Sequence, residues 1–502
     1  MNPTWGIVAV ALVAVATLAI GVFGLRISRT TSDFYVASRS VTPALNGSAI
    51  SGEYLSAASF LGIAGLVLTY GADMLWYPIG WTSGYLLLLV FVAAPLRRSG
   101  AYTIPDFAQV RLQSQAVRRV STALVIGVGW LYLLPQFQGA GLTLQTVLDA
   151  PRWVGTLLVA LIVTANVVLG GMRSITFVQA FQYWLKLTAL LVPLMFLLLA
   201  WSRDGRPEAQ APADWWAPLG GAASPQTIYS TYAVIAATFL GTMGLPHVVV
   251  RFYTNPDGHA ARRTTLIVLV LISAFYLLPT FYGVLGRVYA GDLVGSGRAD
   301  TVALELPSRV IGGSAGELLT ALITAGAFAA FLSTSSGVTM ALAGVVGQGL
   351  SDHGPWRGRL SSIAALRIAA AVCVAVPLVL AFRAEVIPVA NSVVFAFALA
   401  ASTFCPLLVL GIWWRGLTAP GAIAGLVGGG ACAATGPIVT LAFDVDGWWG
   451  TLMGQPAVWS VPVGFALMIG VSLLTRSRIP ANVTRTMVRL HTPERVQVDR
   501  RF

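Results

Sequence analysis

The chain has 502 residues, of which 56% are apolar and 10% are charged, whereas roughly 25% of the residues of a soluble domain are charged. This composition, with a mean hydropathy of +0.78, excludes a soluble globular protein and indicates a polytopic membrane protein. We attribute the net charge of +12 to membrane topology and to contact with an anionic inner leaflet, and not to a nucleic-acid surface.

Apolar runs long enough to cross about 30 Å of hydrocarbon recur along the chain. We count about thirteen such runs, at residues 4–25, 46–70, 75–96, 120–148, 152–170, 175–201, 229–251, 264–289, 315–346, 362–382, 386–413, 418–442 and 457–475. The first run lacks a basic leader and a cleavage site of small residues, so we expect a retained anchor. The expected fold is therefore an all-α polytopic membrane protein.

The second run, 46–70, is interrupted by a glycine and a carboxylate, Gly52 and Glu53. Glycine weakens a helix and a carboxylate is costly in hydrocarbon, so we expect the backbone to open there. Glu53 could anchor a gate, take up a proton or pair with an arginine on the cytoplasmic side, and we favour the ion pair.

The fourth and sixth runs carry three further polar candidates, Tyr132, Gln136 and Lys186. Tyr132 and Gln136 could face a cavity or bond to neighbouring helices. A lysine in mid-membrane is a functional candidate by default, so Lys186 could attract an anionic substrate. A structural pair or a lysine that reaches the membrane surface is the alternative.

The seventh run, 229–251, contains Gly241, Gly244 and Pro246. Proline removes a backbone donor and clashes with the preceding turn, so a second break is expected. The two interrupted runs are five apart and cross in opposite directions, which predicts an inverted repeat of runs 2–6 and 7–11. An ordinary kink in each helix is the alternative.

Hydroxyl groups cluster in the ninth run. Ala330, Ser333 and Thr334 share one helix face, and neutral oxygen ligands suit a monovalent cation. The alternative is that these small residues serve helix packing.

Several motifs together resemble the sodium:solute symporter family. They are Gly-Gly-Met-Arg at 170–173, Gly-Thr-Met-Gly-Leu-Pro-His at 241–247, Arg-Phe-Tyr-Thr at 251–254 and the run 397–422. The stretches 51–62 and 246–254 are most similar to the acetate and monocarboxylate permeases. The resemblance implies a leucine-transporter-type fold of two inverted five-helix units that works by alternating access.

The resemblance also implies a sodium site. Its ligands would be three carbonyls and two hydroxyls, on Gly52, Leu55, Ala330, Ser333 and Thr334. Several members carry an aspartate, proposed to serve a second cation, where this chain has Gln179. We therefore expect Na⁺ as a single coupling ion and no organic cofactor.

We expect the substrate pocket between the two helix breaks and the fourth run, where the amides of broken helices can bind a carboxylate. The substrate candidates are Tyr54, Ser56, Tyr132, Gln136, Thr238, Thr242, Gly244 and Lys186.

The expected function is sodium-coupled import of a short monocarboxylate, such as acetate, propionate or pyruvate. The alternatives are proton coupling with Glu53 or Lys186 titrating, sodium symport of another small solute such as an amino acid, and a sensory membrane module. The chain carries no recognisable nucleophile, phosphate loop or metal cluster, so we expect no enzyme activity. We expect a monomer with the bilayer and the carboxylate as its partners and without nucleic acid.

The basic residues predict the orientation. With the N-terminus outside, 22 of the 31 lysines and arginines lie in cytoplasmic segments, so the C-terminus is expected inside a plasma membrane. We divide the chain into an extra helix and loop (1–45), the first repeat (46–201), the second repeat with its external linker (202–413), two peripheral helices (414–475) and a basic cytoplasmic tail (476–502).

Overall fold

The computed structural model describes residues 3–25, 36–219, 224–353, 361–383, 389–443, 445–494 and 496. Every regular element in these ranges is a helix, and eleven segments are long and apolar enough to span a membrane. The expectation of an all-α polytopic membrane protein is confirmed. Parts of the predicted loop at 26–45 and of the tail at 476–502 lie outside the described residues.

Two of the eleven segments each contain a bend at a glycine. Ala58–Ser99 bends at Gly71, with φ of 72°, and Arg152–Arg203 bends at Gly171, with φ of 63°. Residues with a Cβ atom rarely adopt a positive φ, whereas glycine adopts it readily. The predicted number of thirteen helices counts each of these segments as two and stays a prediction.

The first half of the chain begins with a helix that is broken where the sequence predicts. Helix α3 ends at Tyr54, and a π-helical turn follows at Ala58–Gly62. The helices of this half are α3 (Pro43–Tyr54), α4 (Ile63–Tyr70), α5 (Trp76–Leu87), α6 (Ala93–Ser99), α7 (Ile104–Leu112), α8 (Gln115–Leu148) and α9 (Arg152–Arg203).

The second half also begins with a broken helix. Helix α11 ends at Gly244, Leu245 is extended, and α12 begins at Pro246, whose missing N–H and fixed φ suit the first turn of a helix. The helices here are α11 (Pro225–Gly244), α12 (Pro246–Val250), α13 (Gly258–Tyr289), α15 (Val302–Val310), α16 (Gly313–His353), α17 (Ser362–Arg383) and α18 (Val389–Trp413).

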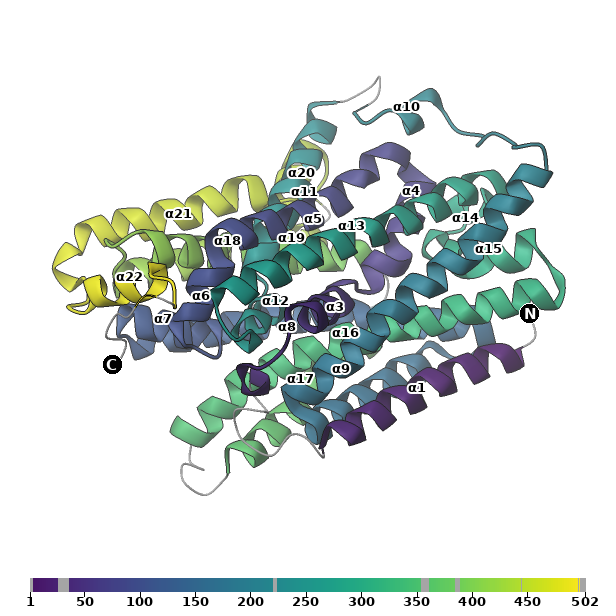
Figure 1. The fold of residues 1–502 in the computed structure, drawn as a ribbon. Coiled ribbons are helices and arrows are strands. Elements are labelled where there is room, and N and C mark those ends of the chain that lie inside the picture. Colours follow the sequence, from purple (N-terminus) through teal and green to yellow (C-terminus); the bar gives the residue numbers. More distant parts are fainter. Residues whose placement is uncertain are drawn as a thin grey trace.

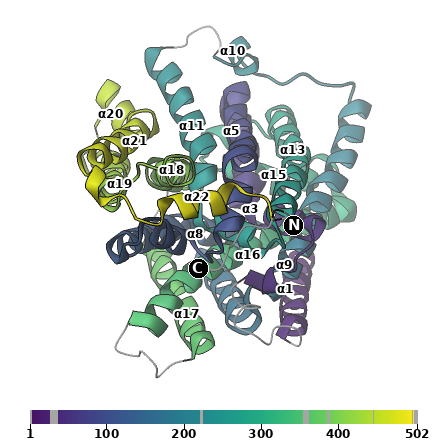
Figure 2. The ribbon, with the colours of Figure 1, turned by 60° about the vertical axis from the view of Figure 1, so that its left-hand side comes forward.

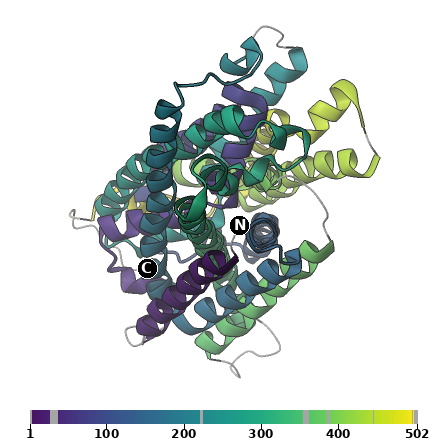
Figure 3. The same cartoon turned by 90° about the vertical axis from the view of Figure 1, so that its right-hand side faces the viewer.

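The remaining helices lie around this core. They are α1 (Pro3–Leu25), α10 (Ala213–Trp216), α14 (Asp292–Gly295), α19 (Ala419–Phe443), α20 (Gly447–Gly454), α21 (Ala457–Leu474) and α22 (Val483–His491). Helix α1 runs along the outside of the bundle against α9 (Figures 1 and 3). Helices α19–α21 form a group beside α18 on one flank (Figure 2). The start of α1 and helix α22 lie at opposite ends of the bundle (Figure 1).

The core of the bundle places α3, α9 and α16 in mutual contact. Close approach requires glycine at Gly52, because a Cβ there would collide with the backbone carbonyl of Gln179 on α9. The break of α3 therefore faces both α9 and α16, and this arrangement positions the candidate site.

Candidate ion and substrate site

The break in α3 frees backbone carbonyls inside the membrane, where each needs a partner. The Leu55 amide still donates to the Ser51 carbonyl at 3.1 Å, but ψ at Leu55 is 88° and the helix does not continue. Side chains from other helices therefore bind the carbonyls of Gly52, Glu53 and Leu55.

Helix α16 supplies two of these partners. The Ser333 hydroxyl lies 2.7 Å from the Gly52 carbonyl and 3.0 Å from the Ala330 carbonyl, and the Thr334 hydroxyl donates to the Glu53 carbonyl at 2.6 Å. The structure thus brings four of the five expected sodium ligands together across the α3–α16 contact, whereas the hydroxyl of the fifth, Thr334, binds the Glu53 carbonyl. We call the carbonyls of Gly52, Leu55 and Ala330, with the Ser333 hydroxyl, the oxygen cage.

Lys186 of α9 reaches into the oxygen cage. Its ammonium donates to the Gly52 carbonyl, to the Leu55 carbonyl at 2.8 Å and to the Ser333 hydroxyl at 2.9 Å. The side chain is fully buried. The sequence left two roles for Lys186, attraction of the substrate carboxylate or a structural pair. In the structure its three donors bind the protein's own oxygens.

The oxygen cage has the neutral oxygen chemistry that Na⁺ accepts, but an ammonium already binds its oxygens. A metal ion would have to share the Gly52 carbonyl and the Ser333 hydroxyl with another cation, and like charges at contact distance repel strongly in a buried site. In the arrangement of the described residues, the oxygen cage therefore fits the Lys186 ammonium and does not fit Na⁺ in addition to it.

A second charged cluster lies beside the cage. The Arg251 guanidinium is 2.6 Å from the Glu53 carboxylate, and both side chains are about 1–2% exposed. Arg251 also donates to Thr176 at 2.9 Å and to the Gln179 side-chain oxygen, while the Gln179 amide donates to the Ser333 carbonyl at 2.7 Å. Glu53 has the arginine partner that we favoured, and Gln179 links the two clusters.

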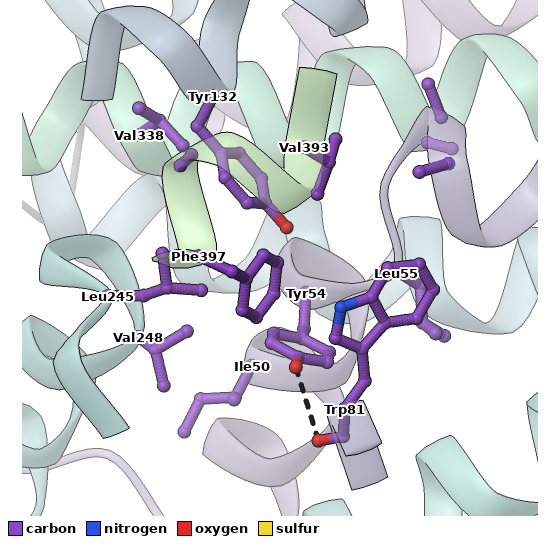
Figure 4. Close-up of a cluster of buried hydrophobic side chains, with 14 of the residues drawn as sticks. Ile50, Tyr54, Leu55, Trp81, Tyr132, Leu245, Val248, Val338, Val393 and Phe397 are labelled. Carbon is purple, nitrogen blue, oxygen red and sulfur yellow. Dashed lines mark hydrogen bonds between the residues drawn. The ribbon is translucent and has the colours of Figure 1, made fainter. Parts of the chain in front are cut away.

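The substrate candidates around the breaks gather beside aromatic rings. The Tyr54 hydroxyl lies 2.7 Å from that of Thr242 and donates to the Trp81 carbonyl at 3.2 Å. The ring of Phe397 lies 6.4 Å from Tyr54, 5.9 Å from Trp81 and 5.9 Å from Tyr132 (Figure 4). We call Tyr54, Trp81, Tyr85, Tyr132 and Phe397 the aromatic box.

The other substrate candidates have different surroundings. Gln136 accepts from the Ala57 amide at 2.9 Å and so caps the helix after the break. The Thr238 hydroxyl donates back to the Val234 carbonyl at 2.7 Å. Gly244 lies against the Ala400 carbonyl, which a Cβ would meet, and Ser56 is buried in the break itself.

Two residues of the box that the sequence interpretation missed are Trp81 and Tyr85 on α5. The Trp81 indole nitrogen and the Tyr85 hydroxyl are buried, and neither has a hydrogen-bond partner among the described residues. Tyr85 packs edge-on against Tyr54, with ring centroids 4.9 Å apart. Their i, i+4 spacing places both on one helix face, which is the signal that could have identified them.

Comparison with known proteins identifies the family of the chain. The family model described as "Sodium:solute symporter family" matches residues 34–429. The chain belongs to the sodium:solute symporter family. As a member, it is a multi-pass membrane symporter of a small solute, and the family favours Na⁺ as the coupling ion.

Individual relatives agree with this membership. The chain is 32% identical over 489 residues to an uncharacterized symporter, YwcA, of Bacillus subtilis, covering 95% of this chain and 91% of the relative. It is 31% identical over 492 residues to a monocarboxylic acid transporter of Corynebacterium glutamicum, covering 86% and 89%.

A solved structure confirms the fold. A Na⁺-coupled sialic acid symporter, captured in a substrate-bound outward-open state, superimposes with a TM-score of 0.68 at 14% sequence identity and covers 93% of this chain and 98% of that one. The expected leucine-transporter-type fold, with broken helices α3–α4 and α11–α12, is therefore confirmed.

Proposed function

We propose that this symporter imports a short monocarboxylate, such as acetate, propionate or pyruvate. The observation that carries the proposal is the 31% identity to a monocarboxylic acid transporter over most of both chains. The wider family moves chemically different solutes, so the choice among them rests on this relative and on the chemistry of the aromatic box.

The aromatic box has the chemistry that a short carboxylate needs. Its ring walls can take a small alkyl group, while the Trp81 N–H and the Tyr85 hydroxyl are buried donors without partners among the described residues. An unpaired buried donor costs free energy, and a carboxylate oxygen would remove that cost. The Lys186 ammonium binds the oxygen cage, and the Tyr54 and Thr242 hydroxyls already donate to the Trp81 and Thr238 carbonyls. We therefore assign the carboxylate to the two unpartnered donors, Trp81 and Tyr85.

Binding to the purified protein tests this assignment. The thermal midpoint should rise with acetate, propionate or pyruvate and stay unchanged with acetamide or propanol, which match them in size but lack the charge. Proline and a six-carbon sugar probe the other solute classes. If proline or the sugar raises the thermal midpoint and the carboxylates do not, the proposal is wrong and the chain carries another class of solute.

We further propose that the chain lies in the plasma membrane as a functional monomer, with its N-terminus outside. The basic segments favour this direction. The start of α1 and helix α22 lie at opposite ends of the bundle (Figure 1), which agrees with an odd number of spans.

A further inference from the structure

Lys186 is the only lysine in the chain, and every other residue counted among its basic side chains is arginine. The two side chains differ physically, because lysine ends in a compact point charge with three donors and arginine ends in a planar fork. This single lysine places its ammonium among the oxygens of the cage.

Those oxygens bind the ammonium much as they would bind a metal ion. Two are carbonyls released by the break of α3, at Gly52 and Leu55, and the third is the Ser333 hydroxyl of α16. Ser333 itself contacts the Gly52 carbonyl at 2.7 Å. The ammonium thus joins α9, the broken helix and α16 through one positive charge.

The surrounding charges do not support a second cation. The nearby carboxylate, Glu53, is already bound by Arg251 at 2.6 Å, and Arg251 brings its own positive charge. The buried group of Glu53, Arg251 and Lys186 then holds two positive charges against one negative charge. Adding Na⁺ to the same oxygens would increase this excess in a region where charge is costly.

We propose that Lys186 is the resident cation of the oxygen cage and excludes Na⁺ from it for as long as the ammonium is bound there. Lys186 is then the residue that sets ion specificity at this site. The break of α3 and the hydroxyl face of α16 are held together without a metal ion. The inference concerns the ion alone and stands whichever solute is carried.

Binding of radioactive Na⁺ to the purified protein in choline chloride tests the proposal. Lys186→Met should gain saturable Na⁺ binding at least about tenfold tighter than that of the native chain. This factor is expected if the Lys186 ammonium leaves the native cage free for less than roughly a tenth of the time. Adding Ser333→Ala to Lys186→Met should remove the gain. Equal Na⁺ affinity in the native chain and Lys186→Met, including no binding in either, would overturn the proposal.

Lys186→Arg is the matched control, because it keeps a positive charge in nearly the same volume. It should gain no Na⁺ binding, and a gain equal to that of Lys186→Met would assign the effect to packing and reject the role of charge. Lys186→Gln provides a second neutral variant in case Lys186→Met does not fold. Folding is checked by the thermal midpoint, which NaCl should raise over choline chloride in the neutral variants only.

The native chain offers a readout that needs no substitution. Because it contains one lysine, labelling lysine side chains with ¹⁵N gives a single ammonium signal by nuclear magnetic resonance. That signal should stay in place at the NaCl concentrations that saturate Lys186→Met. A shift with NaCl but not with choline chloride would show that Na⁺ enters the cage of the native protein, and would contradict exclusion by the lysine.

Discussion

Among single residues, the two donors on α5 that we propose for the substrate carboxylate can be tested one at a time. Trp81→Phe keeps a six-membered aromatic ring and removes the indole N–H together with the five-membered ring that carries it. It should raise KM for the carboxylate about tenfold, the effect of losing a hydrogen bond to a charged group. Tyr85→Phe should act in the same direction. Uptake kinetics measure both effects.

Trp184→Phe is the control for this prediction, because Trp184 is 52% exposed on the outside of α9. Its KM should match that of the native protein. If Trp81→Phe and Trp184→Phe behave alike, the indole N–H of Trp81 does not bind the substrate.

The Glu53–Arg251 pair should be costly to break. Glu53→Gln leaves the Arg251 charge buried without its carboxylate, and we expect a loss of about 3–5 kcal/mol in stability. Replacing both partners, Glu53→Gln with Arg251→Met, should recover part of that loss. Thermal denaturation measures the effect. The more exposed pair of Arg98 with Glu494 is the comparison. Glu494→Gln should cost at most about 1 kcal/mol in stability. Equal losses in the two pairs would remove any special role from Glu53.

At the scale of elements, the broken helices depend on glycines that allow close packing. Gly52→Ala would place a Cβ against the Gln179 backbone, which cannot rotate away as a side chain can. We expect α3 and α9 to separate, with transport largely lost and the thermal midpoint lowered by an overpacking cost of about 1–3 kcal/mol. Gly127→Ala is the control, because nothing lies within 4 Å of a Cβ there. Native uptake in Gly52→Ala would show that this close contact is not needed.

The sequence could locate these elements and not their partners. Gly52 with Glu53, and Gly244 with Pro246, are local signals, and each break lies within a few residues of them. The spacing of seven between Gln179 and Lys186 is two helical turns and puts both on one face of α9, the face that contacts the break and α16. The oxygens that Lys186 meets depend on how α9, α3 and α16 pack, which is long-range and leaves no local pattern. The sequence analysis named Tyr54 and Tyr132 of the aromatic box, but it could not show that their rings meet those of Trp81, Tyr85 and Phe397, because the five rings come from α3, α5, α8 and α18.

At the scale of the whole molecule, the orientation can be tested from the two faces of the membrane. Asp214→Cys on α10 should react with an impermeant maleimide added to intact cells, whereas Ala481→Cys, just before α22, should react only after permeabilisation. Both positions are exposed, so burial does not decide the result. The opposite pattern of labelling would place the N-terminus inside.

We propose that the chain imports a short monocarboxylate by symport. The most direct test is uptake of labelled acetate, pyruvate and proline into proteoliposomes at fixed internal pH, with an inward Na⁺ gradient or with choline in its place, and with or without an inward proton gradient. This proposal predicts that, under an ion gradient, the two carboxylates accumulate above the level reached in empty liposomes, into which the undissociated acids diffuse unaided, and that proline does not. Accumulation of proline without the carboxylates, or carboxylate uptake that only equilibrates under every gradient, would contradict it.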